Sequence, residues 1–112
     1  MNVRFSAQAL RCRVSRAELD RLLSGRAVAL EVTLPRDHVF RVNVRPTTLA
    51  GWQLDTDPTG LWLTIPRTAL ESLSLSAPNK EGVEQTFETS NGGSVAVSFE
   101  VDVKEKRSAV GG

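Results

Sequence analysis

The sequence predicts an α+β domain in which a β-β-α-β-β unit occurs twice, giving about eight mostly antiparallel strands and two short helices. Two segments at an offset of 51 residues, 10–19 and 61–70, suggest this duplication. Each alternates like a strand and then takes up the spacing of an amphipathic helix. Because a flat sheet of this size leaves long unpaired edges that can pair with other chains, we expect it to curl into a barrel or half-barrel.

Four hairpins account for the strands, and the apolar pattern predicts their register, because opposite residues of an antiparallel pair share one face. The pattern places Phe5 opposite Leu10, Val32 opposite Phe40, and Leu54 opposite Leu63. Residues with turn chemistry, such as Pro, Asp, Asn and Gly, occupy most of the connections. The expected turns lie at 6–9, 35–37, 57–60 and 91–93.

The first unit spans about residues 2–45, and the second spans about 53–103. In the second unit the polar segment 74–82 is expected to be the longest loop. The last hairpin then places Phe87 opposite Val97, and its turn ends on a glycine that can adopt a left-handed conformation.

Each unit contains one predicted helix. Ser15 and Glu18 have the spacing of a capping box, which predicts a helix at about 15–24. Proline is favoured in the first turn of a helix, so Pro66 predicts a second helix at about 66–73.

The same alternation predicts one common core on the inner face of the strands and helices. Its expected members are Val3, Phe5, Leu10, Cys12, Val14, Leu19, Leu22, Leu30, Val32, Phe40, Val42, Trp52, Leu54, Leu63, Ile65, Leu70, Phe87, Val97 and Phe99.

Length and composition indicate one domain at 1–105, followed by a frayed tail at 106–112. With 14 basic and 13 acidic residues, the chain offers no general affinity for nucleic acid or membranes, so nucleic acid is an unexpected partner. No apolar run approaches the length of a membrane span, and the first residues lack the apolar region of a signal peptide. We therefore expect a cytoplasmic protein.

The residues that usually carry catalysis are sparse. One histidine and one cysteine cannot form a His-rich or thiolate metal site, and no phosphate-binding glycine motif occurs. We expect Cys12 to be a buried apolar residue, His38 to be packed at a strand end, and Asp55 and Asp57 to belong to a turn. The sequence thus favours a protein that is not an enzyme and has neither cofactor nor metal.

A row of arginines on the outer face gives the sharpest functional signal. Arg4 lies opposite Arg11, with Arg13 on the same face, and like charges in such positions repel each other. The last hairpin is acidic in the same way, and Glu84 is expected opposite Glu100, with Glu88 and Asp102 on that face. Three interpretations follow: the two hairpins neutralise each other within one chain, they do so between the chains of a homodimer, or the arginines bind an anion or a nucleic-acid backbone.

Trp62 is out of phase with its apolar neighbours and is expected to point outward, opposite Asp55. An outward tryptophan can mark a protein interface. It can equally be covered by a helix or by the 74–82 loop.

The opening of the chain resembles a family of short, uncharacterised bacterial proteins whose N-terminus reads roughly I-R-x-x-x-x-S-(I/L)-R-x-R-(L/V)-(S/T)-x-x-E. The matching residues are Val3-Arg4, Leu10-Arg11-Cys12-Arg13-Val14-Ser15 and Glu18-Leu19. The family's small polar loop is replaced by residues 6–9, and its acidic tail is missing. The resemblance implies a bacterial protein and supplies no activity or functional residues.

Two functional hypotheses result. The first is a non-enzymatic protein-interaction or regulatory module, whose partner is another protein or a second copy of the chain, with Trp62 at the interface. The alternative is an anion-handling protein that binds a phosphorylated metabolite or a nucleic-acid backbone through Arg4, Arg11 and Arg13.

Overall fold

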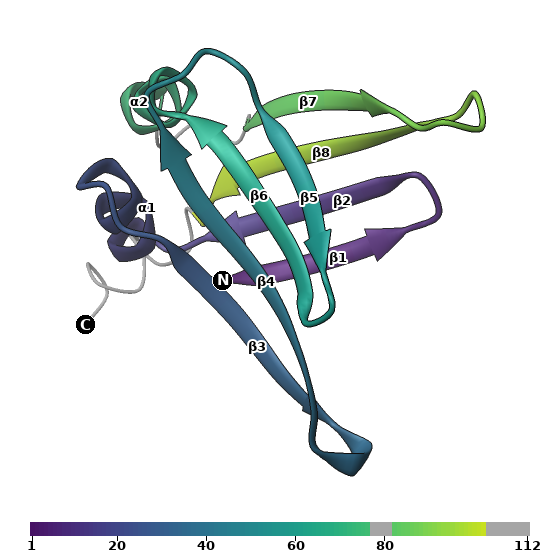
Figure 1. Cartoon of the computed structure of the whole chain (residues 1–112). Helices are drawn as coiled ribbons and strands as arrows, with labels where there is room; N and C mark the ends of the chain where they lie inside the picture. The colour runs from purple at the N-terminus through teal and green to yellow at the C-terminus, as the bar shows by residue number, and fades with distance from the viewer. Residues whose placement is uncertain (77–81, 103–112) are drawn as a thin grey trace.

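The computed structural model describes residues 1–76 and 82–102 of the chain, which form an α+β domain with two α-helices and two four-stranded sheets (Figure 1). The first half of the chain contains β1 (Asn2–Ser6), β2 (Ala9–Val14), α1 (Arg16–Leu23), β3 (Val28–Leu34), a 3₁₀ turn (Pro35–Asp37) and β4 (His38–Thr47). The second half contains β5 (Gln53–Asp57), β6 (Gly60–Pro66), α2 (Arg67–Ser76), β7 (Val83–Glu88) and β8 (Ser94–Val101).

Each sheet is made of two hairpins joined side by side. The first sheet has the order β1-β2-β8-β7 and the second has the order β3-β4-β6-β5. Strands within each hairpin are antiparallel, whereas the central pairs, β2–β8 and β4–β6, are parallel. No described strand of one sheet pairs with the other sheet, so the described strands form two sheets and no closed barrel, and the expected curling into a barrel or half-barrel is not confirmed. The hairpins join through their inner strands, which leaves β1, β3, β5 and β7 as edges.

Three of the four hairpin registers agree with the sequence analysis, including the pairs Arg4 with Arg11 and Asp55 with Trp62. The last hairpin differs by two residues: Phe87 lies opposite Val95 rather than Val97. Its turn comes one residue earlier than predicted, because Gly92 rather than Gly93 adopts the left-handed conformation, with φ = 87°. Since a shift of two residues keeps the same face inward, Val97 still reaches the core.

The two helices lie at one end of the molecule and contact each other (Figure 1). The capping box of α1 is present, since the Ser15 hydroxyl accepts from the Glu18 N–H and the Glu18 carboxylate accepts from the Ser15 N–H. Pro66 ends β6 instead of starting α2, and α2 continues to Ser76, three residues beyond the predicted end. Part of the predicted 74–82 loop is therefore helical, and its section 77–81 lies outside the described residues, as does the predicted tail at 106–112.

None of the described helices is long and apolar enough to cross a membrane. The core lies where these helices pack against the inner faces of the strands. Its fully or nearly fully buried members are Leu10, Cys12, Val14, Leu19, Leu22, Val28, Val44, Leu63, Ile65, Leu70, Leu73, Val97, Phe99 and Val101. Two predicted core residues, Phe5 and Val32, are instead exposed, because the sheets do not close around them.

Candidate functional site

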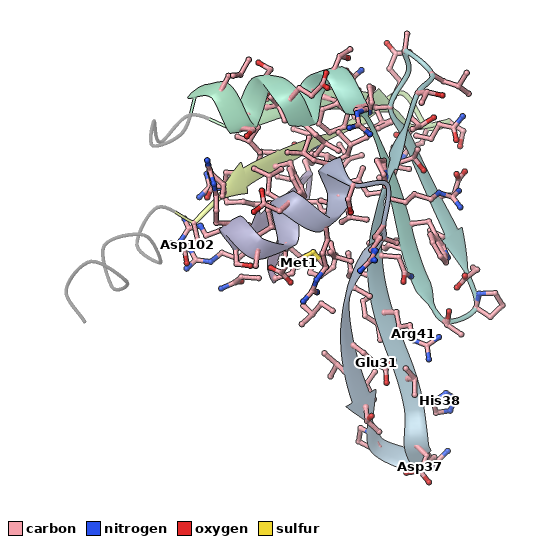
Figure 2. The ribbon with its side chains drawn as sticks, turned by 90° about the vertical axis from the view of Figure 1, so that its left-hand side faces the viewer. Met1, Glu31, Asp37, His38, Arg41 and Asp102 are labelled. Atoms are coloured by element: carbon pink, nitrogen blue, oxygen red, sulfur yellow. The ribbon has the colours of Figure 1, made fainter. Side chains whose placement is uncertain are left out.

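The hairpin of β3 and β4 projects beyond the rest of the molecule (Figures 1 and 2). Its apolar residues continue along the inner face from the core toward the turn, and the outer members are only partly covered by the described residues. Val32 is 45% exposed and Leu34 is 46% exposed. On β1, Phe5 is 59% exposed and meets the half-buried Phe40 edge to face, with ring centroids 6.4 Å apart.

We call this surface the open apolar face, and its members are Phe5, Leu30, Val32, Leu34 and Phe40. Residues of β3 and β4 share this face because alternate side chains of a strand point to one side, and Val32 lies opposite Phe40. Phe5 joins them from the first sheet. The open apolar face therefore combines residues of both sheets.

The opposite side of the same hairpin is polar. Glu31 lies opposite Arg41, and Nε of Arg41 donates to Oε2 of Glu31 at 2.6 Å (Figure 2). His38 follows the turn opposite Leu34, on the side of the open apolar face, and it is exposed, so the expectation of a packed histidine is wrong. The reason is again that the projecting end of the hairpin receives no cover from the rest of the domain. The hairpin thus presents an apolar side and a charge-balanced polar side.

The arginine row forms a second surface, on the outer face of the first sheet. Nη2 of Arg13 lies 2.8 Å from Oε1 of Glu100, which joins the first and last hairpins within one chain. Arg4 and Arg11 are both exposed, and no carboxylate of the described residues forms an ion pair with either of them. Together with Asn2, the three arginines line a small hollow of about 10 Å³. The chain therefore neutralises one arginine of the row and leaves two facing solvent.

The acidic partner row differs from the prediction. The two-residue shift of the last hairpin places Glu84 opposite Ser98, so Glu84 and Glu100 are not opposed. Glu100 lies beside Arg13 in the parallel β2–β8 pair instead. The like-charge repulsion predicted for the acidic hairpin is thus removed by its register.

A search of protein-family models finds that residues 1–108 match a family of unknown function, DUF7009. The chain belongs to this family. Its membership agrees with the resemblance to uncharacterised proteins seen in the opening residues. Comparison with curated proteins and with solved structures finds no match.

In this DUF7009 domain, Trp62 lies on the second sheet, apart from the arginine row. The Arg45 guanidinium sits 4.8 Å from the centre of its ring, and the indole Nε1 donates to Oδ2 of Asp57 at 2.8 Å. Hydrogen bonds from the Thr59 side chain, from Trp62 and from the Thr59 backbone lower the pKa of Asp57 below its ordinary value, which keeps the carboxylate ionised. Trp62 is half-exposed and is held by polar neighbours on its own sheet.

Nucleophilic and metal-binding chemistry has little support in the described part of this DUF7009 chain. No group of three or more His, Cys, Asp and Glu side chains there could hold a metal ion. Cys12 is fully buried, and this burial raises the pKa of its thiol to about 11, so the thiol stays protonated and unreactive.

The open apolar face is the surface that sequence reasoning missed. All of its residues except Leu34 are predicted as core, because alternation alone reports which side of a strand is apolar and not whether another layer covers it. One signal was available: the apolar alternation of 28–34 and 38–44 extends farther than that of the other hairpins. The barrel or half-barrel expected from the sequence would cover this extra length.

Proposed function

We propose that the protein is a non-enzymatic protein-interaction module and that its partner binds at the open apolar face. The observation that carries this proposal is the contiguous exposure of Phe5, Val32 and Leu34 on the inner side of a projecting hairpin. Single exposed apolar residues are common on protein surfaces, whereas contiguous ones mark interaction sites. Covering these side chains removes apolar surface from water, which favours a complex by about 25 cal/mol per Å² of apolar surface buried before the entropy cost of association is subtracted.

The regular pairing of the hairpin supports this proposal. Each residue of β3 is paired with β4, and Glu31 with Arg41 balances the charge on the far side. A surface that is already ordered loses little conformational entropy when a partner binds. The apolar side chains are thus presented in a fixed arrangement.

A photo-crosslinking amino acid at position 34 tests the proposal in cells. We expect a covalent adduct with a protein, because Leu34 lies on the open apolar face. The same amino acid at Leu49, which is 68% exposed in a loop, serves as the matched control and should give no adduct. Absence of any adduct from position 34, with the folded variant present at normal level, would contradict the proposed function.

The arginine row favours a second candidate function, the binding of a phosphate-type anion by Arg4 and Arg11. The supporting observation is that these arginines lie directly opposite each other and have no ion-pair partner among the described residues, although the opposition is unfavourable. A divalent or polyvalent oxyanion bound on the surface over both arginines would neutralise their guanidinium groups through charge-assisted hydrogen bonds.

Thermal unfolding in phosphate, compared with chloride at equal ionic strength, tests the anion hypothesis. A ligand that binds only the native state raises the melting temperature. Phosphate should raise it for the wild type and for Arg26→Ala, an exposed arginine outside the row, but not for Arg11→Ala. An equal rise in all three proteins would show that phosphate acts without this site.

We also propose that the fold arose by duplication of the unit at about 2–45 and 53–103, and that the protein acts in the bacterial cytoplasm. The strand orders support the duplication. Exchanging β1 with β5, β2 with β6, β3 with β7 and β4 with β8 turns the order of one sheet into that of the other.

Cell fractionation tests the cytoplasmic location, and recovery of the protein outside the cytoplasm would contradict it.

A further inference from the structure

Strand β3 differs from the other three edge strands in how its edge is protected. Natural edge strands carry exposed charges that discourage pairing with another chain. Strand β1 has Arg4, β5 has Asp55 and Asp57, and β7 has Glu84 and Glu88. Strand β3, Val-Ala-Leu-Glu-Val-Thr-Leu, has a single charge, Glu31, which Arg41 neutralises from the adjacent strand.

This edge is also accessible. The base of β3 packs near α1, and Val28 is buried there, but every residue from Glu31 to Leu34 is exposed. The hairpin projects away from the body of the molecule (Figure 2), so another strand can approach its edge without meeting the rest of the domain. A strand that pairs there also comes to lie beside the open apolar face.

We propose that this strand is β3 of a second copy of the chain, paired antiparallel across a two-fold axis at Val32. Val32 then lies opposite Val32 of the second copy, and Leu30 lies opposite its Leu34. On the polar side, Glu31 lies opposite Thr33. The second sheets of the two copies would join into one continuous sheet with apolar pairs on one side, an interface in which the same patch serves both subunits.

Charge and side-chain type favour this register over its neighbours. An axis at Glu31 would place the two Glu31 carboxylates opposite each other, which is unfavourable. It would also place Leu34 opposite Val28, which is buried at the base of β3. An axis at Thr33 would place Leu30 opposite Arg36 of the turn. The axis at Val32 alone pairs apolar residues with apolar residues and opposes no like charges.

This inference rests on the proposed function and names the partner as a second copy. Its test uses single cysteines in the purified full chain, with copper–phenanthroline as the oxidant. Opposite residues of an antiparallel pair have Cα atoms about 4.5–5.5 Å apart, a separation that a disulfide can bridge. The native Cys12 is buried and should not react.

We expect Val32→Cys to form a disulfide-linked dimer rapidly. Thr33→Cys, the matched control on the same strand, should not, because its opposite residue is Glu31 of the second copy. Leu30→Cys and Leu34→Cys should crosslink when mixed and much less when each is alone. Rapid crosslinking of Thr33→Cys with none of Val32→Cys would overturn the register, and crosslinking of neither would overturn the dimer.

Sedimentation of the reduced protein gives an independent measurement. The wild type and Leu49→Asp should show a dimer that dissociates on dilution, whereas Val32→Asp should remain a monomer with unchanged circular dichroism. A wild type that stays monomeric at every concentration would reject the second copy as partner. In that case an adduct of position 34 with a different protein in cells would still support the proposed function, and the absence of any adduct would end both.

Discussion

Leu63 shows what complete burial means at the level of one side chain. It lies on β6 with no exposed surface, and Leu54 lies opposite it in the register that the apolar pattern predicts. Leu30, which is also assigned to the core by the sequence, is only half-buried, because it lies where the hairpin of β3 and β4 begins to leave the body. The difference in burial between Leu63 and Leu30 shows that the core ends between their positions.

We expect Leu63→Ala to lower the free energy of unfolding by about 2–5 kcal/mol, the range for fully buried leucines. Leu30→Ala should cost clearly less, since part of its side chain already contacts water. Urea unfolding followed by circular dichroism measures both values. Equal losses in the two variants would contradict the position of the core boundary.

At the residue scale, the sequence predicts to which side of a sheet a side chain points, and it does not predict whether that side chain is buried. Alternation correctly indicates that Cys12, Leu63 and Phe99 point inward, and all three are buried. It indicates the same for Phe5 and Val32, which are exposed. The two groups differ only in whether helices and a second sheet lie over them, and this depends on the arrangement of the elements in space.

The capping box of α1 contains a titrating side chain, the carboxylate of Glu18. Burial alone would raise the pKa of Glu18, but hydrogen bonds from the Ser15 N–H, from the Met1 amino group and from the Ser15 side chain, together with the positive charge of that amino group, outweigh it, so the pKa is lowered. A group whose pKa is lower in the folded state adds stability above its ordinary pKa. That stability is lost as the pH falls through the lowered folded value.

Glu18→Gln should therefore be less stable than the wild type at neutral pH, and the difference should shrink in acid. A substitution of Asp20, an exposed acid on the same helix, by Asn serves as the control and should change the stability little at any pH. Urea unfolding between neutral pH and the acid range measures this dependence. A difference that grows on acidification would contradict the sign.

The start of β6 depends on a glycine. Gly60 is buried with φ = 149°, and a Cβ atom there would overlap the backbone of Arg41, its parallel neighbour on β4. We expect Gly60→Ala to cost at least about 1–3 kcal/mol through backbone strain and to disturb the pairing of β4 with β6. Gly25→Ala offers a comparison, because its φ is also positive but no atom lies near its Cβ position. An equal cost at both sites would argue against the overlap.

At the scale of elements, the features predicted correctly are those that depend on residues close together in the sequence. The capping box, the 35–37 turn and three registers depend on neighbouring residues and were found as predicted. The last hairpin offered two adjacent glycines, Gly92 and Gly93, either of which can take the left-handed position. Sequence alone does not decide between them, because both registers keep the apolar residues inward.

At the scale of the whole molecule, each half of the chain supplies two strands to each sheet. The first sheet combines β1 and β2 with β7 and β8, and the second combines β3 and β4 with β5 and β6. Neither half can build a four-stranded sheet by itself. The sequence predicted the hairpins but not their partners, since a barrel and two separate sheets satisfy the same alternation.

Cutting the chain in the exposed loop after Leu49 tests this interdependence. We expect fragments 1–50 and 51–112 to be largely unfolded alone and to regain the circular dichroism of the intact protein when they are mixed. The intact chain, denatured and refolded in the same buffer, is the control. A fragment that folds by itself as a monomer would contradict the shared architecture.

The central position of β8 in the first sheet has a consequence for synthesis of the protein. Ala9 of β2 pairs with Ala96, so the first hairpin leaves the ribosome long before its neighbour exists. The second sheet lies within residues 28–66 and can assemble earlier. The nascent chain therefore carries β2 with an unpaired edge through most of its translation, a period in which chaperones protect such surfaces.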